Sequence, residues 1–309
     1  MIITLTMNPA IDKTVTIDAF GVDKVNRIGK SRLDAAGKGI NVSKVVRELG
    51  GRTKTIAFLG GASGDFIKET LEKERITLLD VQVDGETRTN IKIVDPLNNT
   101  YTDINDSGSV VGQEQLEVFE KKLMNYVTSQ SVVVFTGSVP PGISKDIYRK
   151  YIERVQSIGA TAVLDADGDL LKQGMLAGPK IIKPNIHELE NFAGRELKTI
   201  DEMVETAKIF IEKGTELVAL SLGSEGALFI QADKVIKAKG LNVDVKGTVG
   251  AGDAMLGAIC YGVHKDLPFE EVVRLAIGAS AAKVCMEGTQ PPSLSHVYEL
   301  SRKVQFEEI

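Results

Sequence analysis

Short apolar runs alternate with segments of helical periodicity along most of the chain. Apolar residues at positions 42, 45, 46 and 49 recur at helical spacing, and Gly50-Gly51 ends this run. The same reasoning predicts strands over residues 2–7, 55–59, 132–135, 161–164, 180–182 and 217–222, and helices over 41–50, 115–127, 145–158, 200–213 and 269–285. Strands that alternate with helices favour an α/β fold, with a mostly parallel sheet covered by helices on both faces.

Two segments depart from this alternation. Residues 13–33 and 81–107 are rich in Thr, Val, Ile, Asp and Asn and show strand alternation with no helix between close pairs. Within the second segment, Thr89–Val94 and Thr100–Ile104 flank a turn at positions 96–99, which predicts a hairpin. We therefore expect one domain over residues 1–309, with a small separate sheet inserted at these two places.

The composition is that of an ordinary globular protein. Of its 309 residues, 43% are hydrophobic and 26% charged, and the net charge of −5 with no basic run disfavours binding to nucleic acid or to a membrane surface. The two cysteines and three scattered histidines have no metal-ligand spacing. No apolar run approaches the roughly 18 residues of a membrane span, and residues 1–7 lack the flanks of a signal peptide. These features predict a cytoplasmic protein.

The strongest local signal for chemistry is the segment Thr248–Asp253, followed by an apolar run. The small residues Gly250, Ala251 and Gly252 let the backbone approach a ligand, and their amides lie where a helix begins, a position that attracts anions. Asp253 would repel a phosphate bound there. It is either a first-turn acid of the helix or a base beside the anion that deprotonates an attacking hydroxyl.

Two other nucleotide motifs are excluded. The dinucleotide fingerprint would need a third glycine where Met255 stands, which argues against a nicotinamide oxidoreductase. The sequence Gly29-Lys30-Ser31 matches the end of a P-loop, but Lys24 occupies the position of its first glycine.

Three further polar clusters follow predicted strands or precede helices. In Ala35–Asn41, glycines on both sides of Lys38 suit a backbone pressed against a polar ligand, although Asn41 is equally explained as a helix cap. In Lys183–Glu188, Asn185 and Glu188 either face a hydrated Mg²⁺ together or simply begin a helix. The segment Ser221–Gly226 is another glycine turn at the end of a strand, where open α/β sheets bind ligands.

Taken together and in this order, the motifs resemble those of the ribokinase/PfkB family of carbohydrate kinases over nearly the whole chain. The ordered set comprises Asn8–Asp12, Gly37–Asn41, Gly60-Gly61, Thr87–Asn90, Gly137–Gly142, Lys183–Asn185 with Glu188, Ser221–Gly223 and Thr248–Asp253. The resemblance implies a ribokinase-like fold, in which a Rossmann-like α/β body carries a small β-sheet lid.

The resemblance also implies roles for the matching residues. Asp253 would be the catalytic base, and the amides of Gly250, Ala251 and Gly252 the anion hole for the γ-phosphoryl group of ATP. Mg²⁺ would be held through water by Asn185 and Glu188. The nucleotide would be bound by Lys183, Asn185, Ser221, Gly223, Ser224, Glu225 and Gly226, with the adenine near Ala279–Lys283. The sugar would be bound by Asp12, Arg27, Gly37, Lys38, Asn41, Arg88, Asn90 and Ser138.

Two arginines indicate the branch of the family that acts on sugar phosphates. Arg27 and Arg88 each fall on an expected lid strand, where a forked donor would suit a phosphate, although both are equally explained as solvated lid charges. The expected reaction is ATP-dependent conversion of fructose 1-phosphate to fructose 1,6-bisphosphate. Tagatose 6-phosphate and fructose 6-phosphate are alternative substrates, and a sensor that binds a sugar phosphate without turnover is an alternative function.

Two further expectations concern a monovalent cation and assembly. Some relatives bind K⁺ beside the anion hole, but Gly247 stands where an acidic ligand would be expected, so no K⁺ site is predicted. Lid strands with one uncovered face often pair across a two-fold axis, which predicts a homodimer through the lid.

Overall fold

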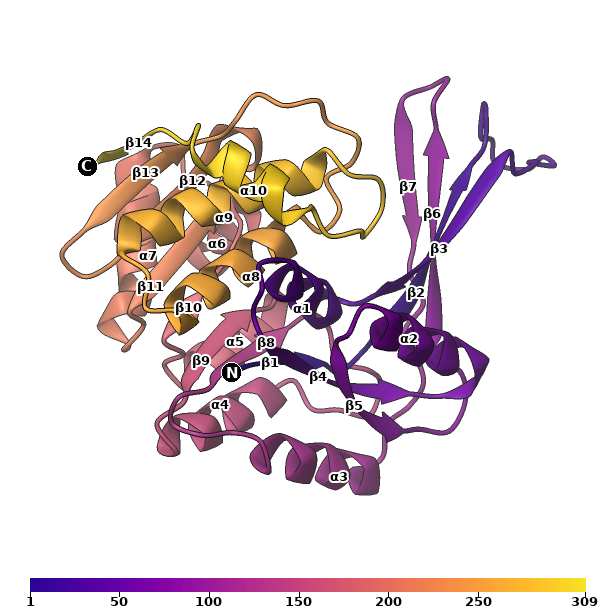
Figure 1. Ribbon diagram of the computed structural model, residues 1–309, viewed down its shortest axis with the longest axis horizontal. Coiled ribbons are helices and arrows are strands. Elements are labelled where there is room, and N and C mark those ends of the chain that lie inside the picture. Colours follow the sequence, from indigo (N-terminus) through magenta and orange to yellow (C-terminus); the bar gives the residue numbers. More distant parts are fainter.

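The computed structural model describes residues 1–309 and contains one large and one small sheet (Figure 1). The large sheet has ten strands in the order β14 (Phe306–Glu308), β13 (Val235–Lys239), β12 (Gly226–Ile230), β11 (Leu217–Ser221), β10 (Ile181–Ile182), β9 (Thr161–Asp165), β8 (Val132–Thr136), β1 (Ile2–Thr6), β4 (Thr53–Leu59) and β5 (Thr77–Gln82). The pairs from β5 to β11 are parallel, and β11 to β14 are joined antiparallel. The expected mostly parallel sheet is confirmed.

Helices cover both faces of the large sheet. One face packs against α3 (Gln113–Met124), α4 (Ile147–Ser157), α5 (Gly168–Met175), α6 (Ile186–Ala193) and α7 (Ile200–Glu212). The other packs against α1 (Lys38–Glu48), α2 (Gly61–Lys73), α8 (Ala251–His264) and α9 (Phe269–Val284), with α10 (Leu294–Ser301) against α9. Successive residues of β1 serve the two cores, because side chains alternate along a strand: Ile3 and Leu5 enter one and Ile2 the other.

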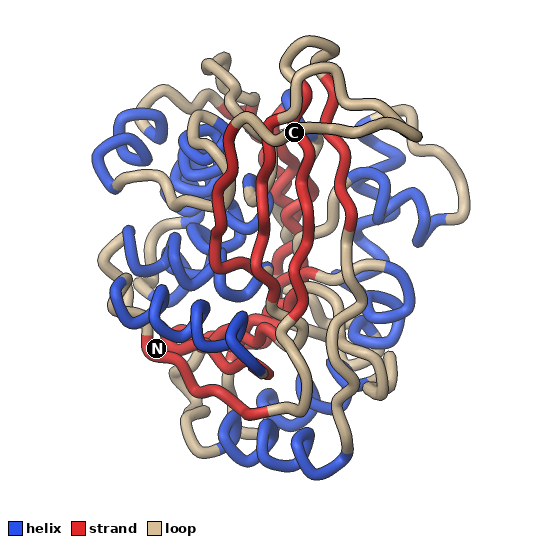
Figure 2. Tube along the Cα trace, turned by 90° about the vertical axis from the view of Figure 1, so that its right-hand side faces the viewer, coloured by secondary structure: helices blue, strands red, loops and turns tan.

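The small sheet stands away from the body as the sequence predicts, but its limits differ. It contains β3 (Lys30–Ala36), β2 (Ala10–Thr16), β6 (Arg88–Asp95) and β7 (Thr100–Ile104) in that order, and Figure 2 shows these strands on the side turned to the viewer. Residues 77–82 instead form β5, the edge strand of the large sheet, where Val81 is buried. The expected segment 81–107 therefore begins too early, because residues 81 and 82 still pair with β4.

All the predicted helices and body strands are present within a few residues. The helix expected over 41–50 begins at Lys38, since Gly37, at φ 128°, is its N-cap residue. The sequence reasoning missed α2, α5 and α10, and it missed the antiparallel strands β12, β13 and β14. None of the helices combines the length and the apolar character needed to cross a bilayer.

The order of the strands places a ligand site at the middle of the large sheet. The chain runs from β1 outward through β4 to β5 and then returns to the other side of β1 with β8. In open α/β sheets, ligands bind beyond the carboxyl ends of strands where the winding direction reverses. The small sheet joins the body beside this point, through β2 directly after β1 and β3 directly before α1.

Candidate active site

A cavity of about 410 Å³ lies beyond the carboxyl ends of β9, β10 and β11, between the body and the small sheet. Thirteen of the residues predicted to act on substrate, nucleotide or metal line it: Asp12, Gly37, Lys38, Asn41, Arg88, Asn90, Lys183, Asn185, Glu188, Ser221, Gly250, Gly252 and Asp253. Ala10, Lys92, Asp165 and Val249 line it as well and were not predicted. The structure thus brings together residues that are up to 243 positions apart (10 to 253).

Asp253 lies in the first turn of α8 and is 7% exposed. Its Oδ2 accepts a hydrogen bond of 2.8 Å from Asn41 Nδ2. Burial raises the pKa of Asp253, although Lys38 and the Asn41 amide favour its charged form. Asp253 is thus the first-turn acid that one interpretation expects, but Asn41 and not an amide of the helix holds its carboxylate. Asn41 lies inside α1 and is not its cap, since Gly37 is the N-cap residue.

The turn before α8 presents main-chain donors to the cavity. Gly250 has φ 79°, a left-handed conformation that glycine adopts without strain. The Ala251 amide donates to the Thr248 carbonyl at 3.2 Å, while the amides of Gly250 and Gly252 have no backbone acceptor. Two of the three amides assigned to the anion hole are therefore free to bind an anion, and that of Ala251 closes the turn.

Two lysines share one buried carboxylate at the floor of the cavity. Asp165, the last residue of β9, lies 3.5 Å from Lys183 Nζ and 3.6 Å from Lys38 Nζ. Burial by itself raises the pKa of Asp165, but the two ammonium groups outweigh it and hold the pKa below its usual range. A Cβ atom at Gly252 would lie 3.2 Å from Lys183 Nζ, so this ammonium lies directly against the first turn of α8.

Asp165 is the main site residue that the sequence reasoning missed. It directly follows the strand predicted over residues 161–164, and a position directly after a strand is the same signal that drew attention to Lys183. Asp165 Oδ1 accepts no hydrogen bond, although it is buried and lies between the two ammonium groups.

The small sheet contributes a second polar group. Asn90 Nδ2 donates to Asp12 Oδ1 at 3.0 Å, and Lys92 Nζ lies 3.7 Å from Asp12 Oδ2. Burial raises the pKa of Asp12, although Lys92 and Asn90 favour its carboxylate. The guanidinium of Arg88 donates to the carbonyls of Pro9, Asp106 and Asn8.

Asn185 and Glu188 form a capping box at the start of α6. Asn185 Oδ1 accepts from the Glu188 amide at 2.9 Å, and Glu188 Oε2 accepts from the Asn185 amide at 2.8 Å. The helix-start interpretation of this pair is confirmed. Burial and the Asp165 carboxylate raise the pKa of Glu188, although the Asn185 amide lowers it.

Several predicted residues lie outside the cavity. Arg27 is exposed on the loop between β2 and β3, not on a strand, and Ser138 is exposed beside Asn8. Residues 223–225 form a short 3₁₀ helix beyond Ser221, and a Cβ at Gly226 would lie 2.1 Å from the Ala238 carbonyl oxygen. Gly226 thus serves the packing of β12. All residues of the segment Ala279–Lys283 except Ser280 are buried. Ser280 is therefore the one residue of this segment with a side chain exposed enough to contact the adenine.

Gly39 also serves the chain's own packing. A Cβ there would lie 2.4 Å from Thr6 Oγ1 and 2.5 Å from the Leu5 carbonyl oxygen. The interpretation of this glycine as space for a ligand is wrong, because the end of β1 fills that space.

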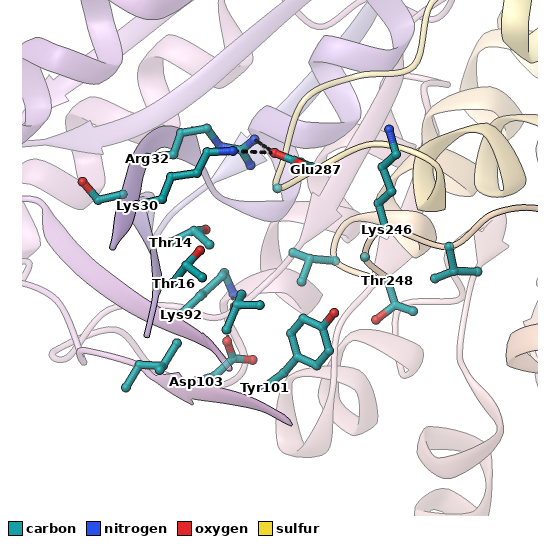
Figure 3. A pocket seen from close by; sticks show the side chains of 17 residues that line it. Thr14, Thr16, Lys30, Arg32, Lys92, Tyr101, Asp103, Lys246, Thr248 and Glu287 are labelled. Atoms are coloured by element: carbon teal, nitrogen blue, oxygen red, sulfur yellow. Dashed lines mark hydrogen bonds and ion pairs between the residues drawn. The ribbon is translucent and has the colours of Figure 1, made fainter. Parts of the chain in front are cut away.

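A second cavity, of about 350 Å³, adjoins the first (Figure 3). Lys92 and Val249 line both cavities. In Figure 3, Lys30 and Arg32 of β3 reach toward Glu287 on the loop after α9, at 3.6 and 3.7 Å. These ion pairs connect β3 of the small sheet to the loop after α9 in the body.

Comparison with known proteins agrees with this arrangement. The sequence is 32% identical over 304 residues to a 1-phosphofructokinase of Vibrio cholerae, and this match covers 98% of this chain and 96% of the relative. It is 34% identical over 281 residues to a 1-phosphofructokinase of Escherichia coli, and that match covers 91% of this chain and 90% of the relative. The solved phosphofructokinase-2 of Escherichia coli with substrates and products superposes with a TM-score of 0.93, at 26% identity, over 98% of both chains. Residues 3–296 match the family described as pfkB family carbohydrate kinase. With the ribokinase-like fold, the cavity between body and small sheet, and relatives matched almost end to end, the chain belongs to the pfkB family of ATP-dependent carbohydrate kinases.

Proposed function

We propose that this kinase phosphorylates a hydroxyl of a ketohexose phosphate, namely fructose 1-phosphate, to give fructose 1,6-bisphosphate. The observation that carries the proposal is the position of the Asp253 carboxylate. It is held by Asn41 in the same cavity as the free amides of Gly250 and Gly252, so that a base and an anion site face one ligand.

Asp253 acts as the general base. Asn41 occupies its Oδ2, which leaves Oδ1 for the hydroxyl of the sugar. A raised pKa makes the carboxylate a stronger base at neutral pH. The hydroxyl oxygen attacks the γ-phosphorus of ATP as its proton passes to Asp253, and ADP leaves on the opposite side.

The positive groups around Asp253 stabilise the charge that develops on the transferred phosphoryl group. The amides of Gly250 and Gly252 point from the start of α8, and the Lys183 ammonium lies against the same turn. Such preorganised donors in a site closed to water supply much of the rate enhancement of phosphoryl transfer. Asp165 fixes Lys183 and Lys38 in place.

The residues present fit a hydrated Mg²⁺. No group of three or more His, Cys, Asp or Glu side chains forms a full protein ligand set. Mg²⁺ in kinases is instead held by one or two carboxylates, water and the phosphates of the substrate, and Glu188 provides a carboxylate that lines the cavity. Asn185 and Glu188 would hold the ion through water, and the ion would neutralise charge on the phosphates.

The end of the sugar that carries the phosphate is inferred from the relatives and from Arg88. The relatives described above are named 1-phosphofructokinases, whereas a solved phosphofructokinase-2 of Escherichia coli is described in complex with fructose-6-phosphate. Arg88 lines the cavity from the first position of β6 and would bind the phosphate already on the sugar.

A substrate panel tests the proposal. ADP release is measured with Mg-ATP and, separately, fructose 1-phosphate, fructose 6-phosphate, tagatose 6-phosphate and fructose. We expect the highest kcat/KM with fructose 1-phosphate. A preference for either 6-phosphate would replace the proposed substrate by that sugar, and binding of all four without ADP release would favour the sensor function.

We also propose that the protein forms a homodimer through the small sheet. The sheet and its loops expose large apolar side chains, including Val22 (89% exposed), Val25 (78%) and Tyr101 (70%), which a partner would cover. Light scattering at working concentration should give the mass of a dimer, and Val25→Asp should shift it toward the monomer. A monomer at every concentration would contradict the proposal.

A further inference from the structure

A buried lysine that no role described above accounts for lies behind the proposed anion hole. Lys283, in the last turn of α9, is 3% exposed. Its ammonium donates to the Gly288 carbonyl, and no carboxylate lies within 4 Å of it. Burying a charge with so few partners is unfavourable, so its presence requires a compensating interaction or a function.

The position of Lys283 connects it to Gly250. A Cβ atom at Gly250 would lie 3.2 Å from Lys283 Cε, so the lysine side chain packs directly under the turn that begins α8. The amides of Lys246 and Gly247 donate to the Val284 carbonyl, at 2.8 and 3.2 Å. The start of the anion-binding turn is therefore attached to the C-terminal end of α9.

This attachment creates an electrostatic conflict. The C-terminal end of a helix carries partial negative charge, which would weaken a phosphate site built beside it. The Lys283 ammonium lies in that last turn and opposes this charge, next to the amides of Gly250 and Gly252 that face the cavity.

Charged groups on three neighbouring elements act on Lys283. Arg32 and Asp34 lie on β3, Lys44 on α1 and Asp253 on α8. A Cβ at Gly288, whose carbonyl accepts from Lys283, would collide with the Arg32 guanidinium, so the small sheet reaches this carbonyl as well. Burial, followed by Arg32, lowers the pKa of Lys283 to about 8, while Asp34 and Asp253 raise it.

We propose that Lys283 is a positioning residue that holds a positive charge under the Gly250 turn and so strengthens the binding of the terminal phosphoryl group of ATP. The proposal rests on the proposed function, because it takes the Gly250 turn as the site of that group. Lys283 acts through the turn and requires no contact with the sugar.

Nucleotide binding tests this without any sugar. Calorimetry compares β,γ-imido-ATP with ADP for the full chain, for Lys283→Met and for the control Lys44→Met. Lys44 is also buried, at 5% exposed, and also donates to a backbone carbonyl, that of Ala35, but its partner carboxylate is Glu74. We expect Lys283→Met to weaken the imido-ATP complex about tenfold and the ADP complex by less than about twofold. Lys44→Met should leave the ratio of the two affinities unchanged.

The unmodified protein provides a second measurement, which remains informative if Lys283→Met does not fold. The preference for imido-ATP over ADP should fall between pH 7.5 and pH 9.5, because Lys283 loses its proton near pH 8. Lys38 stays charged over this range, since Asp165 raises its pKa. In Lys283→Ala, millimolar ammonium chloride should restore part of the lost affinity for β,γ-imido-ATP, and tetramethylammonium chloride should not.

The outcomes separate the two proposals. If the unmodified protein binds neither nucleotide, the proposed function fails. If it binds both, and either Lys283→Met weakens both equally or the preference is constant across the pH range, the inference about Lys283 is wrong and the proposed function stands.

Discussion

Replacing Asp253 by asparagine should lower turnover and raise stability at the same time. The substitution preserves size, and the new amide oxygen can still accept from Asn41 Nδ2, which lies 2.8 Å from the carboxylate in the native chain. It removes the one group placed to take a proton from the sugar. Loss of a general base costs about 10²–10⁴ in rate, which corresponds to about 3–5 kcal/mol in the activation barrier.

The stability change follows from the pKa of the same group. Burial raises the pKa of Asp253 further than Lys38 and Asn41 lower it, so the fold favours the neutral side chain. For an acid whose pKa is raised on folding, the folded state binds more protons than the unfolded state, and the stability falls as pH rises through the folded pKa. Asparagine is neutral at every pH, so Asp253→Asn should melt above the native protein at pH 7, and the difference should shrink in acid.

The assay combines coupled ADP release with thermal unfolding at pH 7 and pH 4.5. Asp169→Asn is the control, since Asp169 is an exposed acid in the first turn of α5. We expect the control to change neither turnover nor melting temperature. Turnover of Asp253→Asn within tenfold of the native value, or a melting temperature below it at pH 7, would refute the reasoning.

Three other substitutions test the site and its frame. In steady-state kinetics, Arg88→Ala should raise the KM for the sugar phosphate about tenfold or more and the KM for ATP by less than about twofold. Equal increases in the two KM values would contradict the assignment of Arg88 to the sugar phosphate. Asp165→Asn leaves two ammonium groups without their shared partner and should lower the free energy of urea unfolding by about 3 kcal/mol at pH 7. This loss should diminish below about pH 4, because the pKa of Asp165 is lowered on folding. Gly39→Ala forces a Cβ against the Leu5 carbonyl and should lower the free energy of urea unfolding by about 1–3 kcal/mol. An unchanged urea midpoint would show that β1 shifts to accommodate the added methyl group.

The fold could be predicted from the sequence because the patterns that mark its strands and helices are local and recur along the chain. Compact apolar runs marked β8, β9 and β11, since strands buried on both faces need no polar positions, and β1 was marked by apolar residues that alternate with Thr. The edge of the large sheet was harder to predict. β5 has a mixed pattern, because only Val81 of its six residues is buried, and it therefore resembled the half-exposed strands of the small sheet.

The site could be predicted from the sequence where a motif fixes its own backbone geometry, as at Gly250. It was not accessible where function depends on a long-range contact. Nothing local to Asn41 indicates that it holds a carboxylate 212 positions away, and nothing local to Gly39 shows whether a ligand or β1 occupies the space beside it. Conversely, Glu188 was ambiguous because a carboxylate that caps a helix and one that faces a hydrated ion occupy the same position in the sequence.

The balance of charge in the cavity explains why a kinase of this kind needs donors that carry no formal charge. Four cationic side chains line the cavity, from Lys38, Arg88, Lys92 and Lys183, and they are matched by four carboxylates, from Asp12, Asp165, Glu188 and Asp253. The side chains therefore provide no net positive charge for two anionic substrates, and the chain as a whole is negative. Under the proposed function, attraction would come from elsewhere: from a metal bound with the phosphates, from the amides and dipole at the start of α8, and from the ammonium of Lys283 beneath them. In the proposed mechanism a carboxylate is the base, and adding cationic side chains beside it would lower its pKa and weaken it as a base. The proposed mechanism therefore assigns the phosphoryl group chiefly to neutral backbone donors, because even Lys283, which interacts with Asp253, favours the charged form of that carboxylate.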